Sequence, residues 1–252
     1  MAESLKEKVV LVTGGASGIG RAAALAFARE MAKVVVADLD AEGAKETARL
    51  IKSRRGEATS MRCDVSESAE VDALVSETVK LYKRLDCAFN NAGILGEMSS
   101  TADCTEENFD RIIKVNLKGV WLCMKYEIPQ MIKQGGGVIV NTSSNAGMKG
   151  VPGLPAYGAS KSGIVQLSRT AALEYAKFGI RVTAVCPGFI FTPMVEKQRA
   201  SYPEVVEKFA AQQLLGRLGK PEEIAEAVVW LCTEAASYVT GYPIVVDGGA
   251  LA

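Results

Sequence analysis

Tyr157 and Lys161 are four residues apart in the chain. If this segment is helical, both side chains project from one face, about 5–6 Å apart. A phenol exchanges protons poorly near neutral pH because its ordinary pKa is about 10, and a fixed ammonium nearby would lower that pKa. The pair could therefore act as a general acid or base. Because the same spacing is common among solvated neighbours on helices, the rest of the chain must decide its role.

The 252-residue sequence contains no histidine, which excludes Ser-His-Asp and Cys-His catalysis and every imidazole-based metal site. No carboxylate motif indicates a metal. The six cysteines are scattered, as is typical of reduced thiols in a cytoplasmic protein. The formal net charge is zero, and no run approaches the roughly 18 apolar residues of a membrane span. We expect a cytoplasmic protein that binds neither nucleic acid nor membrane.

Short apolar runs alternate along the chain with longer amphipathic stretches. Strands are expected at 9–12, 33–38, 58–63, 85–89, 137–142, 180–186 and 242–246. Helices are expected at 21–31, 42–54, 66–82, 105–133, 156–177 and 221–234. Several of the strands are apolar on both faces, which indicates helices on both sides of a sheet. The pattern predicts one α/β domain over residues 1–252, with a doubly wound parallel sheet of about seven strands.

A glycine-rich segment, residues 13–20, follows the first strand and opens the first helix. Glycines let the backbone turn tightly and approach a pyrophosphate, which then sits at the positive end of the helix dipole. The spacing Gly-x3-Gly-x-Gly differs from the commoner Gly-x-Gly-x-x-Gly, so an ordinary strand-to-helix turn is the alternative. The position after strand one favours a dinucleotide site, with contacts from Gly14, Ser17, Gly18, Ile19 and Gly20.

Asp38 ends the second strand, 18 residues after Gly20. This is near the offset of about 20 residues at which an acidic side chain meets the ribose hydroxyls. A carboxylate there accepts hydrogen bonds from both hydroxyls and repels a 2′-phosphate, and neither Ser17 nor Leu39 offers that phosphate a cation. We therefore predict NAD as the cofactor rather than NADP. The alternative for Asp38 is a helix-capping or turn aspartate.

With these features in place, the chain resembles the short-chain dehydrogenase/reductase family over essentially its whole length. The resemblance is specific because seven short motifs follow in the family's order. They are the glycine-rich loop, Asp64-Val65, Asn90-Asn91-Ala92-Gly93, Asn116, Ser144, Pro187-Gly188 with Thr192, and Asp247-Gly248-Gly249. The resemblance implies a single-domain, Rossmann-like oxidoreductase.

The resemblance also implies catalytic roles for Asn116, Ser144, Tyr157 and Lys161. Tyr157 would transfer the proton, and Ser144 would hydrogen-bond the substrate oxygen. Lys161 would lower the pKa of Tyr157 and hold the nicotinamide ribose, while Asn116 would place a water that links Lys161 to solvent. Only the offset of 13 residues from Tyr157 distinguishes Ser144 from its neighbour Ser143. Asn116 could otherwise be a polar residue on an exposed helix face.

Further cofactor contacts are implied at positions that follow successive strands. They are Leu39, Asp64, Val65, Asn91, Ala92, Gly93, Tyr157, Lys161, Pro187, Gly188, Ile190, Thr192 and Met194. Two of these have ordinary structural alternatives. Asn91, like Asn90, could be a turn residue that tolerates left-handed backbone, and Thr192 could cap the helix that follows it.

The segment from about 189 to 219 resembles the family's substrate-covering lid. Substrate contacts are expected from Ser144, Ala146, Leu154, Tyr157 and Phe189, with Ile94, Leu95, Met148, Val151 and Met194 as further lining candidates. Most of these side chains are apolar, and the set includes no carboxylate or arginine. We expect a secondary alcohol or ketone on an apolar small molecule, cyclic ones included. Some of the candidates could instead be ordinary core or interface residues.

Two other functions compete with this one. A 3-oxoacyl-thioester reductase would usually prefer NADPH and carry a basic residue in the glycine-rich loop, where this chain has Ser17. A non-catalytic nucleotide sensor need not keep the acid–base residues, all of which are present.

The helical stretches 105–133 and 156–177 carry apolar residues on most of their faces, among them Val120, Leu122, Met124 and Leu167. Because family members pair these helices between subunits, we expect a homotetramer.

Overall fold

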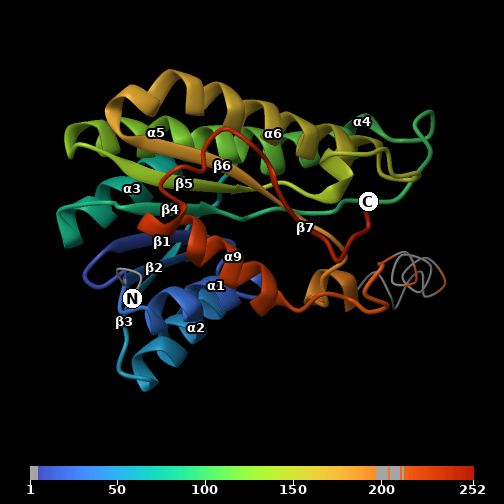
Figure 1. The fold of residues 1–252 in the computed structure, drawn as a ribbon. Coiled ribbons are helices and arrows are strands. Elements are labelled where there is room, and N and C mark those ends of the chain that lie inside the picture. Colours follow the sequence, from blue (N-terminus) through green and yellow to red (C-terminus); the bar gives the residue numbers. More distant parts are fainter. Residues whose placement is uncertain (1–4, 197–203, 205–210, 212) are drawn as a thin grey trace.

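A computed structural model describes residues 5–196, 204, 211 and 213–252 of the chain (Figure 1). Within these residues, seven parallel strands form one sheet in the order β3-β2-β1-β4-β5-β6-β7. The strands are β1 (Val9–Thr13), β2 (Lys33–Asp38), β3 (Glu57–Arg62), β4 (Cys87–Asn90), β5 (Gly137–Thr142), β6 (Ile180–Pro187) and β7 (Ile244–Val246). The predicted doubly wound parallel sheet is confirmed.

Helices cover both faces of this sheet, as the apolar strands predict. One layer contains α1 (Gly18–Arg29), α2 (Ala41–Ser53) and α9 (Pro221–Leu231), and the other contains α3 (Ser68–Tyr82), α5 (Gly119–Lys133) and α6 (Pro155–Tyr175) (Figure 1). Successive strand residues point to opposite layers: Val10 and Val12 belong to the core under α1 and α9, and Leu11 to the core under α3, α5 and α6. The strands inside the sheet, such as β1 and β2, therefore carry apolar residues at consecutive positions.

The stretch 105–133 is not one regular helix. It consists of α4 (Glu106–Ile112), a π-helical segment from Ile113 to Lys118, and α5. The π-helical segment contains Asn116, whose side chain is fully buried and hydrogen-bonded to the main chain of Ile94. Wider helical turns of this kind are common at functional sites. Side-chain periodicity does not reveal the interruption, because the chain stays helical on both sides of it.

The stretches 105–133 and 156–177 do expose apolar side chains, but not those of Val120, Leu122 or Met124. Val120, Leu122 and Met124 are buried within the chain's own core. The large apolar side chains that stay exposed in these two stretches are others: Phe109, Trp121 and Leu173. Their exposed fractions are 40%, 44% and 86%.

The strand order reverses between β1 and β4, which pair with opposite neighbours of the sheet. In open α/β sheets, ligands bind beyond the carboxyl ends of the strands at such a point. Of the expected lid, residues 197–203, 205–210 and 212 lie outside the described residues. In the part of the chain that the structure describes, no helix combines the length and apolar character needed to cross a bilayer.

Candidate active site

A cavity of about 470 Å³ lies at the carboxyl edge of the sheet. Segments that follow β1, β2, β3, β4, β5 and β6 all contribute to its wall. The residues predicted to bind the cofactor line this one cavity, with the exception of Gly20. Positions that are far apart in the sequence, such as Ser17 and Thr192 (175 residues apart), therefore meet at one site.

The glycine-rich loop depends on close backbone contact. Gly14 has a φ of +67°, a conformation that favours glycine. A Cβ on Gly20 would overlap the carbonyl oxygen of Gly14. Gly20 is thus required for the loop to close on the start of α1 and does not itself line the cavity. Ser17 precedes α1 with an extended backbone, and its side chain makes no capping hydrogen bond.

Asp38 is joined to the glycine-rich loop. Its Oδ2 accepts a hydrogen bond from the amide of Ala16 at 2.9 Å, and its Oδ1 accepts one from the amide of Asp40 at 3.0 Å. The side chain that caps α2 is Asp40, which accepts from the amide of Gly43. Asp38 therefore does not cap the helix, and with Leu39 it lines the cavity beside the loop.

Asp64 and Val65 extend the same wall beyond β3. Burial raises the pKa of the Asp64 carboxyl, but hydrogen bonds from Ser66 and the charges of Lys114 and Arg62 outweigh this, so the net pKa is lowered. The Oδ1 atom of Asp64 accepts from the amide of Ser66 at 2.9 Å. Asp64 is thus a fixed carboxylate at this end of the cavity.

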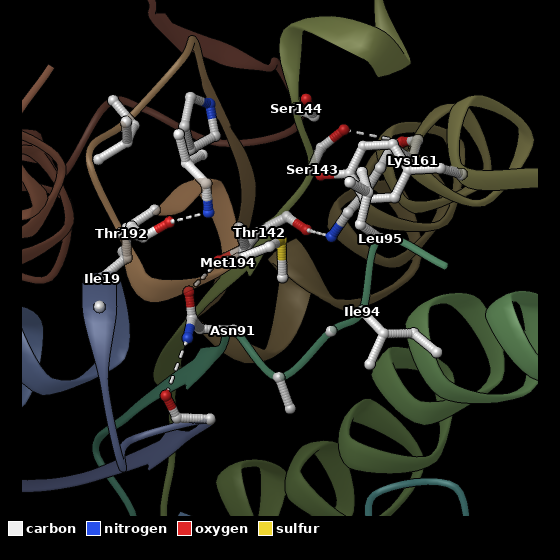
Figure 2. A pocket seen from close by; sticks show the side chains of 18 of the residues that line it. Ile19, Asn91, Ile94, Leu95, Thr142, Ser143, Ser144, Lys161, Thr192 and Met194 are labelled. Atoms are coloured by element: carbon white, nitrogen blue, oxygen red, sulfur yellow. Dashed lines mark hydrogen bonds between the residues drawn. The ribbon is translucent and has the colours of Figure 1, made fainter. Parts of the chain in front are cut away.

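Asn91 connects two strands across the switch point. Its side-chain nitrogen donates to the carbonyls of Thr13 and Gly14 at 3.3 Å each, and its Oδ1 accepts from the hydroxyl of Thr142 at 3.3 Å (Figure 2). Neither Asn90 nor Asn91 has a positive φ. The alternative of left-handed turn residues is therefore wrong for both.

Thr192 lies against the glycine-rich loop. A Cβ on Gly18 would stand 3.3 Å from its methyl carbon. Its hydroxyl accepts from the amide of Val195 at 3.4 Å, so the alternative capping role is present in this structure (Figure 2). Pro187, Gly188, Ile190 and Met194 accompany it along the cavity wall.

Tyr157 and Lys161 project from the first two turns of α6, which begins at Pro155. The Nζ of Lys161 lies 5.6 Å from the centroid of the Tyr157 ring and donates to the carbonyl of Thr142 at 2.8 Å. Ser144 follows β5 on the same cavity wall, and its Oγ accepts from the amide of Ala146 at 3.1 Å. The structure thus brings Ser144, Tyr157 and Lys161 together, whereas the hydroxyl of Ser143 donates to the carbonyl of Lys161 (Figure 2).

The pKa values of Tyr157 and Lys161 shift in opposite directions because both groups are partly or wholly removed from water. Burial raises the pKa of the Tyr157 phenol, while a side-chain hydrogen bond with Ser144 acts in the opposite direction. Burial lowers the pKa of the Lys161 ammonium to about 8. The pKa of Tyr157 is therefore raised overall, because desolvation of the phenol dominates.

Asn116 lies behind the cavity wall. Both of its amide hydrogens are used, one in a bond of 2.9 Å to the carbonyl of Ile94 and one in a bond of 3.2 Å to the hydroxyl of Ser160. Its Oδ1 accepts from the amide of Ile94 at 2.8 Å. It is a fully buried residue, so the alternative of an exposed polar side chain is wrong. In this arrangement Asn116 fixes the segment after β4 against α6.

The substrate end of the cavity is mainly apolar. Ser144, Ala146, Leu154, Tyr157 and Phe189 line it as expected, together with Ile94, Leu95 and Val151. Met148 does not line it and is 42% exposed. The sequence did not point to Asn145, Lys149, Gln213 or Ala250, which also line the wall. The ammonium of Lys149 donates to the carbonyl of Ala250 at 2.7 Å. The two residues are 101 positions apart, so no local sequence pattern predicts this contact.

Across the described ranges, no group of three or more His, Cys, Asp or Glu side chains is placed to hold a metal ion. The residues at the end of the cavity formed by the glycine-rich loop fit a dinucleotide. The loop has the close Gly14–Gly20 contact and an amide-rich turn before α1, and the Asp38 carboxylate stands beside it.

Comparison with known proteins agrees with this geometry. A family model described as enoyl-(acyl carrier protein) reductase matches residues 14–250. The chain is 41% identical over 248 residues to the cyclohexanol dehydrogenase of Acinetobacter sp. (strain SE19), covering 98% of this chain and 96% of that protein. It is 42% identical to the 3-oxoacyl-[acyl-carrier-protein] reductase FabG of Thermotoga maritima (strain ATCC 43589 / DSM 3109 / JCM 10099 / NBRC 100826 / MSB8), covering 97% and 98%.

Among solved structures, the crystal structure of levodione reductase superimposes with a TM-score of 0.95 at 38% identity. The superposition covers 98% of this chain and 99% of that one.

Proposed function

Since the chain belongs to the short-chain dehydrogenase/reductase family, we propose that it interconverts a secondary alcohol and a ketone on an apolar small molecule with NAD as cofactor. It is an oxidoreductase of CH–OH groups that uses a nicotinamide cofactor. We propose the choice of NAD, the kind of substrate and the roles of the individual residues.

One observation supports the assignment of roles most directly. The acid–base residues Ser144, Tyr157 and Lys161 line the same cavity as the glycine-rich loop and Asp38. A dinucleotide held at the loop would extend along the wall toward these side chains, as ligands do beyond the carboxyl ends of such sheets. The bound nicotinamide would supply or accept the hydride.

The chain itself handles the proton. Tyr157 gives a proton to the ketone oxygen in reduction, and takes it from the alcohol hydroxyl in oxidation. Ser144, held by the amide of Ala146, hydrogen-bonds the same oxygen as its charge changes. Lys161 holds the ribose hydroxyls, and Asn116 keeps the segment after β4 in contact with α6.

The pKa shifts favour one direction at neutral pH. Because burial raises the pKa of Tyr157, the phenol is protonated near pH 7 and ready to donate. Reduction of a ketone should therefore fall as pH rises, and oxidation of the alcohol should rise with pH.

The environment of Asp38 supports NAD. Its carboxylate faces the cavity where the ribose of the adenosine would lie, next to Leu39 and Ser17. The basic residues among the described lining side chains are Lys149 and Lys161, and both follow β5. The Arg21 guanidinium is engaged by the carbonyl of Ala16 and the hydroxyl of Thr47. A 2′-phosphate would thus meet a negative charge and no free cation on this wall.

The apolar substrate end supports a small, ring-like alcohol or ketone. Ile94, Leu95, Val151 and Leu154 offer dispersion contacts and no charge. Similarity to cyclohexanol dehydrogenase and to levodione reductase is consistent with this choice. The similarity to FabG keeps a 3-oxoacyl thioester as the competing substrate class.

A panel of cyclic and acyclic ketones, with one 3-oxoacyl thioester, tests this proposal through NADH and NADPH absorbance. We expect the highest kcat/KM for a cyclic ketone with NADH. Tyr157→Phe should reduce kcat by about 10²-fold or more while cofactor binding stays within a few-fold. A preference for NADPH with the thioester would replace this function by the competing one.

We propose a homotetramer as the assembly. Phe109, Trp121 and Leu173 leave apolar surface on α4, α5 and α6, and Tyr238 and Tyr242 leave more near β7. Exposed apolar side chains of this size are typical of contacts between subunits. Light scattering after size exclusion should give four times the chain's 26.7 kDa, and a monomeric mass would contradict this assembly.

A further inference from the structure

Two consecutive residues, Thr142 at the end of β5 and Ser143 after it, hydrogen-bond the side chain and the main chain of Lys161. Its ammonium donates to the carbonyl of Thr142 at 2.8 Å. Its own main-chain carbonyl accepts from the hydroxyl of Ser143, also at 2.8 Å (Figure 2). Ser143 is 2% exposed, so water cannot easily replace this hydroxyl.

Ser143 is itself fixed to the sheet. Its amide donates to the carbonyl of Val185 at 2.8 Å, and its side chain acts to lower the pKa of Cys186, against the raising effect of burial. Val185 and Cys186 both belong to β6. Ser143 therefore links β6 to α6: its amide bonds β6, and its hydroxyl bonds the main chain of α6 at Lys161.

The main chain of Gly147 packs closely against the Ser143–Lys161 bond. A Cβ on Gly147 would lie 2.6 Å from the Ser143 hydroxyl and 2.8 Å from both the carbonyl carbon and oxygen of Lys161. Three segments thus meet at this bond: the end of β5, the short helix Asn145–Gly147 and α6. Close packing of this kind passes small displacements on rather than absorbing them.

We propose that Ser143 is a positioning residue. Its hydrogen bond to the main-chain carbonyl of Lys161 fixes where the first turns of α6 lie relative to the end of β5. It thereby places the Lys161 ammonium and the Tyr157 hydroxyl relative to Ser144. Ser143 acts through the main chain of Lys161 and donates its proton to no reacting atom. Misplacement of a catalytic group by about 1 Å can cost about 10²-fold in rate, so one hydrogen bond suffices for a measurable effect. The proposal rests on the proposed function for its activity readout.

The test is Ser143→Ala, with Ser168→Ala as the matched control. Ser168 is also buried on α6, donates to the carbonyl of Ile164 at 2.8 Å and accepts from Asn141 at 3.0 Å. Both variants lose one buried hydroxyl that bonds a helix carbonyl. Only Ser143→Ala should lower kcat by about 10- to 100-fold and move the midpoint of the kcat–pH profile by about half a unit. Ser168→Ala should lower the Tm and leave both kinetic quantities near wild type.

Ser143→Cys keeps a weak donor of similar size and should recover part of the lost kcat. The same variants are compared by cofactor Kd, measured from protein fluorescence, because Lys161 is the ribose contact. If wild type turns over none of the substrates, the proposed function fails, and a weaker Kd in Ser143→Ala alone still supports the positioning role. A wild-type kcat, pH profile and Kd in Ser143→Ala, or equal changes in Ser168→Ala, would overturn it.

Discussion

Two clusters of polar side chains lie along helix α6 and in or just after strand β5. The first, at the carboxyl edge, contains Ser144, Tyr157 and Lys161 and lines the cavity. The second lies deeper, between the sheet and α5, and consists of Asn90, Glu127, Asn141 and Ser168. None of these last four residues lines the cavity.

Both clusters contain an ionisable group with a strongly shifted pKa. Burial lowers the pKa of Lys161 to about 8 and raises that of Glu127 to about 7, although a hydrogen bond from Asn90 opposes the shift at Glu127. A shifted pKa is often used as a sign of a functional residue. Here the shift has the same cause in both places, and only the cavity distinguishes the site from the structural cluster.

The hydrogen bonding of the two clusters also differs. The Lys161 ammonium and the Ser144 hydroxyl each have a partner. In the deeper cluster, the Oε1 of Glu127 and the Oδ1 of Asn90 have no hydrogen-bond partner among the described residues. Both atoms are acceptors when Glu127 is ionised, and among the described residues no donor faces either of them. A proton on Glu127 removes the uncompensated buried charge. A neutral Glu127 is therefore the form that this core accommodates.

The largest expected effect compares Lys161→Met with Glu127→Gln. Loss of the Lys161 ammonium removes the ribose contact and should lower kcat/KM by about 10²-fold or more. Glu127→Gln changes a group outside the cavity and should leave kcat/KM within about twofold of wild type. Steady-state kinetics on both variants measure the difference. A loss of activity in Glu127→Gln as large as that in Lys161→Met would show that the deeper cluster takes part in the reaction.

The next effect concerns stability against pH. The native pKa of Glu127, about 7, exceeds the unfolded value, so the unfolded chain ionises first. The contribution of Glu127 to stability is therefore complete below pH 4 and is lost as pH rises through 7. By pH 8 this costs the native state about 3 kcal/mol, from about 1.4 kcal/mol per pKa unit.

Glu127→Gln should remove this dependence, since an amide keeps the shape, can still accept the hydrogen bond from Asn90 and does not ionise. Urea unfolding at pH 5 and pH 8 measures the free energy of unfolding for both proteins. The variant should exceed wild type at pH 8 by about 2–3 kcal/mol and differ little at pH 5. Parallel pH curves for the two proteins would mean that Glu127 does not carry the native proton.

The smallest effect comes from a buried hydroxyl that belongs to neither cluster. Thr183 on β6 is 1% exposed, and its Oγ1 has no hydrogen-bond partner among the described residues. Thr183→Val keeps the shape and removes a desolvated polar atom, so stability should rise by about 1 kcal/mol. Thermal unfolding and kcat together check this, and a lower Tm would show that the hydroxyl has a partner such as a buried water.

Much of the site was predictable because its residues sit in short local motifs. The glycine-rich loop, Asp38 and the Tyr157–Lys161 spacing follow from nearby positions in the sequence, and the family resemblance adds Ser144. Lys149, Gln213 and Ala250 were missed because they reach the cavity through contacts between distant segments. Met148 was wrongly included because apolar character alone does not give the direction of a side chain.

Asn90 and Asn91 show most clearly what the sequence predicts and what only the structure reveals. The family resemblance in Asn-Asn-Ala-Gly assigned Asn91 to the cofactor and gave Asn90 no role of its own. In the structure, Asn90 turns into the core toward Glu127 and Asn141, and Asn91 bonds the glycine-rich loop at the cavity. Successive residues at a strand end point to opposite sides, and only the tertiary packing decides which side is core.

The sequence by itself determined the strand–helix alternation, the order of the motifs and the exclusion of histidine chemistry, because these depend on residue types and local spacing. The tertiary structure decided the protonation tendencies and the positions of the reactive groups. The pKa values of Tyr157 and Lys161 depend on burial, and burial is a property of the packed chain. The bond from Ser143 to Lys161 likewise exists only because β5 and α6 are packed together.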